Sequence, residues 1–188
     1  MKELFEFAAE VQQLCEQHHW EFCFIGGIAV QRWSEPRLTK DVDITLITGF
    51  GSEEQFVDTL LGVYEPRRPD AREFALLNRV LLLKSPRGIG IDAALGGLPF
   101  ERSAVQRATY YAFLPKTKLR TCSAEDLVVF KSFAGRPLDW QDVKMTIARQ
   151  GSANLDWGYI FGHLKELAAL KEQPEIVRQL QALKAEFK

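Results

Sequence analysis

Hydrophobic residues recur along the chain with two periods, one typical of helices and one typical of strands. Leu4, Ala8, Val11 and Cys15 fall on one helical face, so residues 2 to 18 are predicted to form an amphipathic helix. Short apolar runs bounded by turn residues predict β-strands. We expect strands over residues 21 to 25, 42 to 48, 79 to 84, 89 to 94, 105 to 113 and 118 to 121. The turn residues Ser85 to Gly88 predict that the strands over 79 to 84 and 89 to 94 pair as a hairpin.

Helical patterns cover much of the remaining sequence. A short helix is expected over residues 28 to 33, and another from Ser52 to Val63, where Ser52 is a plausible N-cap. After Thr121 the pattern is helical throughout, with helices expected over residues 123 to 134, 139 to 149, 156 to 172 and 174 to 187. The prediction is an α/β (α+β) fold with a mixed core over residues 1 to 121 and a helical part over residues 122 to 188.

Composition narrows the class of protein without identifying it. The formal net charge is −1, so a nucleic-acid partner would have to be held by a local basic patch. Three cysteines are too few for a disulfide framework or a zinc site. No apolar run reaches the length of a membrane span, and the acidic N-terminus is unlike a signal peptide, so a cytoplasmic protein without a membrane partner is expected.

The most informative motif is a pair of glycines followed by two aspartates. The apolar run Phe22 to Ile25 leads into Gly26 and Gly27, where a strand end and a helix start could approach a phosphate closely. Asp41 and Asp43 are two apart on a predicted strand, so their side chains share a face. Paired carboxylates are suitable ligands for one or two Mg²⁺ ions. The alternative interpretation is a tight turn followed by a polar strand end.

Asp92 is a third candidate carboxylate. It stands between apolar residues in the predicted strand over residues 89 to 94, where an ionised side chain is costly unless something pairs with it. A metal shared with Asp41 and Asp43 would offset that cost, and Asp92 could also act as a base toward an attacking hydroxyl. Exposure at the rim of the sheet is the alternative.

On a helical wheel Lys131 falls between Leu127 and Val128, within the apolar stripe of its predicted helix. Such a lysine either extends to solvent or meets an anion, for which a nucleotide triphosphate is one candidate. Asp139 and Asp142 share a face of the next helix, where Asp139 is a plausible N-cap and Asp142 a first-turn acid. One of these acids could also orient Lys131 or the ligand.

These motifs resemble the nucleotidyltransferase superfamily, whose signature is an apolar-Gly-Gly/Ser turn, a gap of about a dozen residues and then Asp-x-Asp/Glu on the next strand. The stretch from Lys131 to Asp142 looks like the Lys-x-x-Ala-x-x-Arg-x-x-Asp-x-x-Asp segment of AbiEii/AbiGii-type nucleotidyltransferase toxins, with slightly different spacing. Arg37 and Thr39, just before Asp41, also fit that group. The resemblance covers roughly residues 20 to 150.

The resemblance implies a nucleotidyltransferase-fold mixed sheet, a helical part that completes the nucleotide cleft, two Mg²⁺ ions and an NTP such as ATP as donor. The implied metal ligands are Asp41, Asp43 and Asp92, and Lys131 and Asp139 join them as catalytic residues. The implied nucleotide-binding residues are Gly26, Gly27, Arg37, Thr39, Lys131 and Asp142.

Family members act as toxins of toxin–antitoxin systems, some by adding nucleotides to tRNA. The resemblance therefore implies tRNA as one acceptor and a cognate antitoxin as a partner. A protein or an aminoglycoside-like small molecule is an alternative acceptor, and a catalytically silent module that binds NTP or a partner is the alternative from another class.

Overall fold

A computed structural model describes residues 1 to 187, and the chain divides into two compact units. The first unit comprises residues 1 to 28 and 38 to 122. The second comprises residues 29 to 37 and the chain from Ser123 onwards. The helix α2 (Gly26–Trp33) supplies residues to both.

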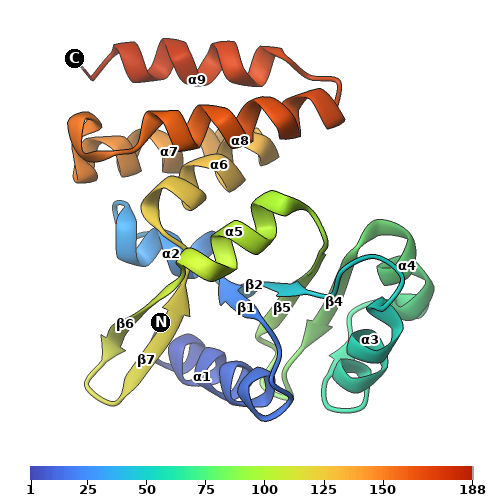
Figure 1. Cartoon of the computed structure of the whole chain (residues 1–188). Helices are drawn as coiled ribbons and strands as arrows, with labels where there is room; N and C mark the ends of the chain where they lie inside the picture. Colours follow the sequence, from blue (N-terminus) through green and yellow to red (C-terminus); the bar gives the residue numbers. More distant parts are fainter. Residues whose placement is uncertain (188) are drawn as a thin grey trace. The chain divides into compact units, whose positions relative to one another are not determined.

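The first unit is built on a mixed sheet in which the strand order is β3-β4-β5-β2-β1-β7-β6 (Figure 1). The pairs β2 with β5 and β1 with β7 are parallel, and the other neighbours are antiparallel. The strands are β1 (Phe22–Phe24), β2 (Asp41–Ile47), β3 (Glu65–Pro66), β4 (Val80–Lys84), β5 (Gly90–Gly96), β6 (Thr109–Leu114) and β7 (Thr117–Thr121).

Helices pack on the sheet because alternate strand residues are apolar. The main core joins the sheet to α1 (Lys2–Gln17), α3 (Glu53–Leu61) and α4 (Ala71–Asn78). It contains Val42 and Ile44 of β2 and Ile91 and Ala93 of β5, each at most 1 % exposed. Figure 1 shows α5 (Pro99–Arg107) and α1 on opposite sides of β1. The side chains of the strand residues between those core positions therefore point to the opposite face of the sheet.

The second unit is helical. It contains α6 (Ala124–Ala134), α7 (Pro137–Gln150), a 3₁₀ turn (Ser152–Asn154), α8 (Trp157–Leu170) and α9 (Glu175–Ala185), drawn from yellow to red in Figure 1. Helix α6 contacts α7, α8 and α9. The core of this unit is formed by Leu127, Val128, Val143, Ile147, Ile160, Leu164 and Leu180, all fully buried.

The predicted fold class is confirmed, and so is the pairing of the strands around residues 79 to 84 and 89 to 94 as antiparallel neighbours. One predicted strand is wrong in part. Residues 105 to 107 end the helix α5, which begins at Pro99, and only β6 from Thr109 is extended. The Glu101 side chain accepts hydrogen bonds from the backbone N–H groups of Gly97 and Leu98, which fixes the start of that helix. Helix α4 was not predicted.

Two further expectations concern burial and membranes. Cys23, which lies in an apolar run and is expected to be a small core residue, is fully buried, and so are Cys15 and Cys122. Within residues 1 to 187, no helix combines the length and the apolar character that crossing a bilayer requires.

The N-cap of α6 tests whether a capping side chain stabilises this helix. The Ser123 hydroxyl accepts a hydrogen bond from the Asp126 N–H at 3.1 Å, and the Asp126 carboxylate accepts one from the Ser123 N–H at 3.1 Å. Ser123→Ala should lower the free energy of unfolding by about 1 kcal/mol, measured by urea denaturation. Ser52→Ala is the matched control, because Ser52 caps α3 without a side-chain hydrogen bond. Equal losses in the two variants would contradict the role of the Ser123 cap.

Candidate active site

Three carboxylates lie on one partly open face of the sheet in the first unit. Along β2, Asp41 and Asp43 are half-buried while Val42 and Ile44 are buried, so the two aspartates face away from the main core. On the parallel neighbour β5, Asp92 is paired in register with Asp43. Residues paired in this way have their side chains on the same face, with backbones about 4.8 Å apart. We call Asp41, Asp43 and Asp92 the carboxylate row.

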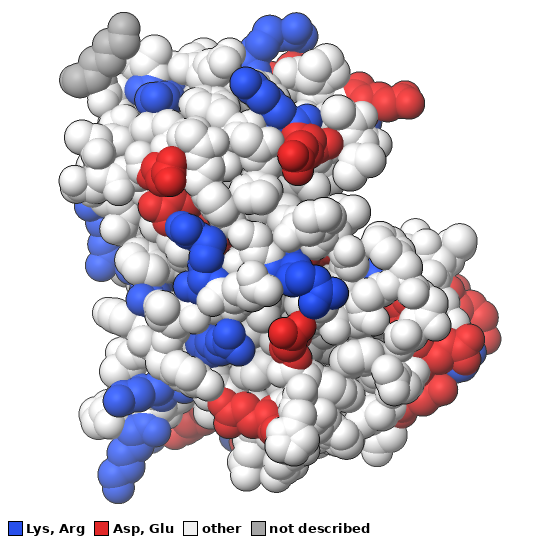
Figure 2. Space-filling model, in the orientation of Figure 1, with Lys and Arg blue, Asp and Glu red and all other residues white. Residues whose placement is uncertain are grey.

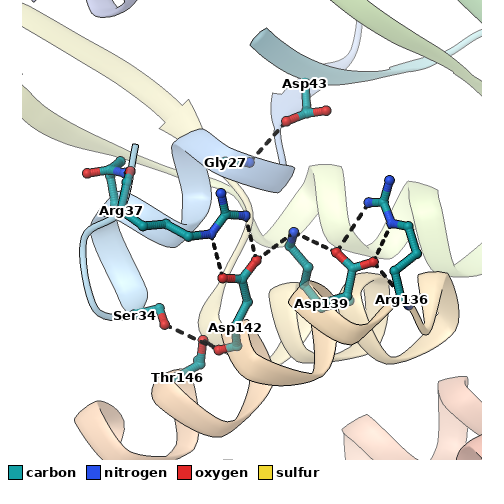
Figure 3. A network of polar contacts seen from close by, with 10 residues as sticks. Gly27, Ser34, Arg37, Asp43, Arg136, Asp139, Asp142 and Thr146 are labelled. Carbon is teal, nitrogen blue, oxygen red and sulfur yellow. Dashed lines mark hydrogen bonds and ion pairs between the residues drawn. The ribbon is translucent and has the colours of Figure 1, made fainter. Parts of the chain in front are cut away.

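Positions 26 and 27 must be glycine, because neighbouring side chains occupy the space that a Cβ atom would take. Gly26 has a φ angle of +50°, and a Cβ atom there would overlap the Asp43 carboxylate. A Cβ atom on Gly27 would overlap the Thr39 hydroxyl. The Gly27 N–H, in the first turn of α2, donates a hydrogen bond to Asp43 Oδ2 at 3.0 Å, as Figure 3 shows. The glycine turn thus lies directly against one member of the carboxylate row.

Asp92 has a different partner. The Arg67 guanidinium forms an ion pair with the Asp92 carboxylate, and its Nη2 also lies 3.4 Å from the Ile91 carbonyl oxygen. Arg67 follows the short strand β3, at the edge of the sheet. The sequence showed Arg67 only as part of a basic loop, because nothing in its spacing reveals that it reaches a residue on β5.

The donor set of the carboxylate row fits a divalent cation of the Mg²⁺ type. Such ions take oxygen ligands, and aspartates on adjacent strands can share one ion. In the part of the chain that the structure describes, no three His, Cys, Asp or Glu side chains are grouped closely enough to hold a metal ion as they stand. The side chains of Asp43 and Asp92 are instead directed at Gly27 and Arg67. Binding a common ion would require these two contacts to loosen.

The second unit holds the remaining charged candidates in a buried ion-pair cluster, formed by Arg37, Lys131, Arg136, Asp139 and Asp142. Lys131 Nζ lies 2.9 Å from Asp139 Oδ1 and 2.8 Å from Asp142 Oδ2. The Lys131 side chain is 8 % exposed, and the two carboxylates are 2–3 % exposed. Lys131 therefore does not extend to solvent. The anions it meets in the structure belong to its own chain.

Two arginines complete this cluster from its outer side (Figure 3). Arg37 binds Asp142 in a two-pronged geometry, with both N–O distances at 2.7 Å. Arg136, whose side chain is 74 % exposed, binds Asp139 through Nε at 2.6 Å and Nη2 at 3.2 Å. Three cations thus surround two carboxylates, so every buried charge in the cluster has an oppositely charged neighbour.

The local structure of α7 explains how its two acids are placed. The helix begins at Pro137 with Arg136 as the N-cap residue, so Asp139 is not the N-cap. Asp139 lies in the first turn, where Oδ2 accepts a hydrogen bond from the Arg136 N–H at 3.3 Å. Asp142 lies beyond the first turn, so the prediction that it is a first-turn acid is also wrong. The two acids still share a face, because residues three apart are neighbours on a helix.

Opposing effects set the pKa values of these acids. Burial by itself raises the pKa of Asp139, but hydrogen bonds from Arg136 and Lys131 outweigh it, and the pKa lies below the ordinary value of 3.8. The same holds for Asp142, where burial is outweighed by hydrogen bonds from Arg37 and Lys131. Both aspartates are therefore ionised at neutral pH in the folded chain.

Hydrogen bonds to backbone carbonyl oxygens join residues 33 to 37, which precede the carboxylate row in the sequence, to α7. The Ser34 and Thr146 hydroxyls both donate to the Asp142 carbonyl, at 3.2 and 2.8 Å. Gln150 Nε2 donates to the Trp33 carbonyl at 2.7 Å. Arg37 is thereby held beside Asp142. The sequence showed Arg37 and Asp142 as separate candidates, and their pairing joins residues 105 apart in the chain.

A separate hollow in the second unit holds none of these candidates. It has a volume of about 580 Å³ and is lined by residues of the 3₁₀ turn, α8 and α9, among them Trp157 and Lys184. The Lys184 ammonium lies 4.6 Å from the Trp157 ring centre, so its charge already faces an aromatic ring.

Lys131→Met tests the buried ion-pair cluster. The change removes the cation shared by Asp139 and Asp142 and should lower the free energy of unfolding by about 3 kcal/mol, since Arg37 and Arg136 still pair with one carboxylate each. Urea denaturation provides the measurement. Lys144→Met is the matched control, because Lys144 pairs with Glu186 at a half-exposed site and should cost less than about 1 kcal/mol. Similar losses in both variants would contradict the importance of burial here.

The lowered pKa values also predict an acid-dependent stability. In acid the unfolded chain binds protons on these two aspartates before the folded chain does, so their stabilisation is complete above the ordinary value of 3.8 and is lost as pH falls below it. The free energy of unfolding should therefore fall from about pH 5 toward about pH 3. Asp142→Asn should show a shallower fall in urea titrations over that range. Parallel curves for the two proteins would contradict the prediction.

Comparison with known proteins supports the fold by shape rather than by sequence. No family model and no curated protein matches the sequence. The structure is similar to an antigenic nucleotidyltransferase-like protein from Paracoccidioides brasiliensis, with a TM-score of 0.53 and 18 % identity over 98 % of this chain and 93 % of that one. It is also similar to the antibiotic-resistance factor ANT(2″)-Ia, with a TM-score of 0.59 and 14 % identity over 91 % of this chain and 96 % of that one. The mixed sheet and flanking helices therefore form a nucleotidyltransferase-like fold.

Proposed function

We propose that the chain is a Mg²⁺-dependent nucleotidyltransferase that moves a nucleoside monophosphate from an NTP to an acceptor hydroxyl. The observation that carries this proposal is the carboxylate row, in which Asp43 and Asp92 are register partners on adjacent strands and Asp41 shares their face. The glycine turn against Asp43 adds a second element of the signature. Three acidic side chains on one face of adjacent strands repel one another, and this cost argues against a catalytically silent module.

In the proposed reaction the acceptor oxygen bonds to the α-phosphorus of the NTP as the bond to pyrophosphate breaks. The proton of the attacking hydroxyl passes to a carboxylate, for which Asp92 is the candidate. The chemistry that bound Mg²⁺ supplies is neutralisation of the triphosphate and of the developing charge on the reacting oxygens. The protein's own task is to position the reactants, because such reactions depend mainly on orientation and charge neutralisation.

Nucleotide binding is assigned to the residues that the resemblance implies. Gly26 and Gly27 would offer backbone N–H groups to phosphate, with Thr39 beside them. Arg37, Lys131, Asp139 and Asp142 belong to the nucleotide site in this proposal. Of these, Arg37 is the one whose side chain is partly exposed, at 29 %, and so it is the most direct candidate for a phosphate contact.

The acceptor is proposed on two separate grounds. The resemblance of the segment from Lys131 to Asp142 to AbiEii/AbiGii-type toxins supports tRNA as acceptor, a cytoplasmic toxin role and a cognate antitoxin. In Figure 2 blue and red side chains are both present on each unit, so on the face shown the described residues offer RNA local basic patches rather than a uniform basic field. The likeness to an antibiotic-resistance factor supports an antibiotic-type small molecule as the second candidate.

Transfer assays test the proposal and separate the acceptors. Each α-³²P-labelled NTP is incubated with the protein, Mg²⁺ and either total tRNA, lysate protein or a panel of aminoglycosides. Label in one acceptor class is expected, and chelation with EDTA should abolish it until Mg²⁺ is restored. Absence of label in every arm would overturn the proposed transfer.

Asp43→Asn gives the matched test of the carboxylate row. Loss of one charged ligand should lower the rate at least about 100-fold, because metal-ion stabilisation is worth several kcal/mol. The amide oxygen of asparagine can still accept the Gly27 hydrogen bond, so the fold should persist. Asp58→Asn is the control, since Asp58 of α3 pairs with Arg72 of α4 at an exposed position. Full activity of the Asp43 variant would overturn the assignment.

A further inference from the structure

Arg67 belongs to the same row of residues across the sheet as Asp43 and Asp92. Pro66 of β3 pairs with Leu83 of β4, and the Arg67 N–H continues that ladder by donating to the Leu82 carbonyl at 3.0 Å. Leu82 pairs with Asp92, and Asp92 pairs with Asp43. Partners in register have their side chains on one face. The backbone therefore directs Arg67 toward the carboxylate row across one intervening strand.

The space above β5 is shaped to receive its guanidinium. A Cβ atom on Gly90 would lie 3.2 Å from Arg67 Nη1 and would overlap Asp41 Oδ1. The missing side chain at Gly90 thus leaves room in which the Arg67 guanidinium and the Asp41 carboxylate both lie. Arg67 completes its contacts by pairing with Asp92. One cation is thereby placed among the carboxylates of the row.

Neighbouring arginines of the same segment behave differently. Arg68 pairs with Asp70, two residues further on, and Arg72 pairs with Glu54 and Asp58 of α3. These carboxylates lie outside the row. The contact of Arg67 is therefore specific to its place in the sheet and is not a general property of a basic loop.

We propose that Arg67 is a positioning residue, the resident counter-ion of the carboxylate row, and that a divalent cation reaches Asp92 only by displacing its guanidinium. This inference rests on the proposed function. The guanidinium already occupies Asp92 Oδ1, and a metal ion bound to either oxygen of this carboxylate would lie beside that positive charge and be repelled by it. The Arg67 and Asp92 side chains are 30 % and 36 % exposed, so water can assist the exchange.

The test is Mn²⁺ binding without nucleotide, measured by electron paramagnetic resonance of the free ion. Arg67→Gln should bind Mn²⁺ roughly three- to fivefold more tightly than the unmodified chain, which corresponds to the upper part of the range for a partly exposed ion pair. Arg68→Gln is the matched control, because it removes the same charge one residue away, and its affinity should change less than about twofold. Asp92→Asn should weaken binding, and adding Arg67→Gln to it should bring no further gain.

Each outcome bears on one of the two proposals. Unchanged or weaker Mn²⁺ binding by Arg67→Gln, with Asp92→Asn still weakening it, overturns the counter-ion role alone. An equal gain in Arg68→Gln, or a full gain from Arg67→Gln in the Asp92→Asn background, also overturns it, since the effect would then be general electrostatics. If neither Asp92→Asn nor Asp43→Asn alters Mn²⁺ binding, the metal site of the proposed function fails, and this inference fails with it.

Discussion

Mutual repulsion of carboxylates in register on two parallel strands is the constraint from which the candidate site follows. Strand pairing fixes the Asp43 and Asp92 backbones at neighbour spacing, and Asp41 lies one pleat away on the same face. Ionised groups this close are stable only when donors or cations lie beside them. The structure supplies a backbone N–H from the glycine turn for Asp43 and a guanidinium for Asp92. The Arg67 contact is exposed and the Gly27 contact is part-buried, so the guanidinium is the partner that an incoming cation can replace more readily.

In the second unit, two neighbouring carboxylates are stabilised by buried ion pairs instead of by exposed contacts. Its two aspartates are almost completely enclosed, and they are matched by one buried lysine and two arginines on the outer side. A buried pair gains little net stability over apolar residues of the same size, but losing one partner is costly. Such a cluster therefore fixes the relative position of α6, α7 and the segment that carries Arg37.

The sequence predicted the parts of the site that depend on short-range spacing. Two aspartates two residues apart on a strand must share a face, and the hairpin signal placed Asp92 on the strand beside Leu82. The glycine turn was visible because two glycines directly after an apolar run indicate a close backbone approach, and the structure adds that a Cβ atom on Gly26 would overlap the Asp43 carboxylate. The roles of these residues stay predictions.

What the sequence could not show depends on long-range pairing or on competing local signals. Strand β3 consists of Glu65 and Pro66, which reads as a loop, so the row that leads from Arg67 to Asp92 was invisible. Helix α5 ends directly before the apolar strand β6, and the aromatic run after Arg107 made residues 105 to 107 look extended. The pairing of Lys131 with both acids of α7 depends on how two helices pack, which periodicity alone does not specify.

The two-residue strand β3 determines which face of the sheet receives a positive charge. Because strand side chains alternate, one extra residue within β3 could be absorbed only by bulging the chain or by slipping the pairing. A slip would turn Arg67 toward the apolar core and bring Pro66 or Arg68 to its place. The register of this short strand is thus tied to the ionic contacts of a residue two strands away, although neither Glu65 nor Pro66 belongs to the carboxylate row.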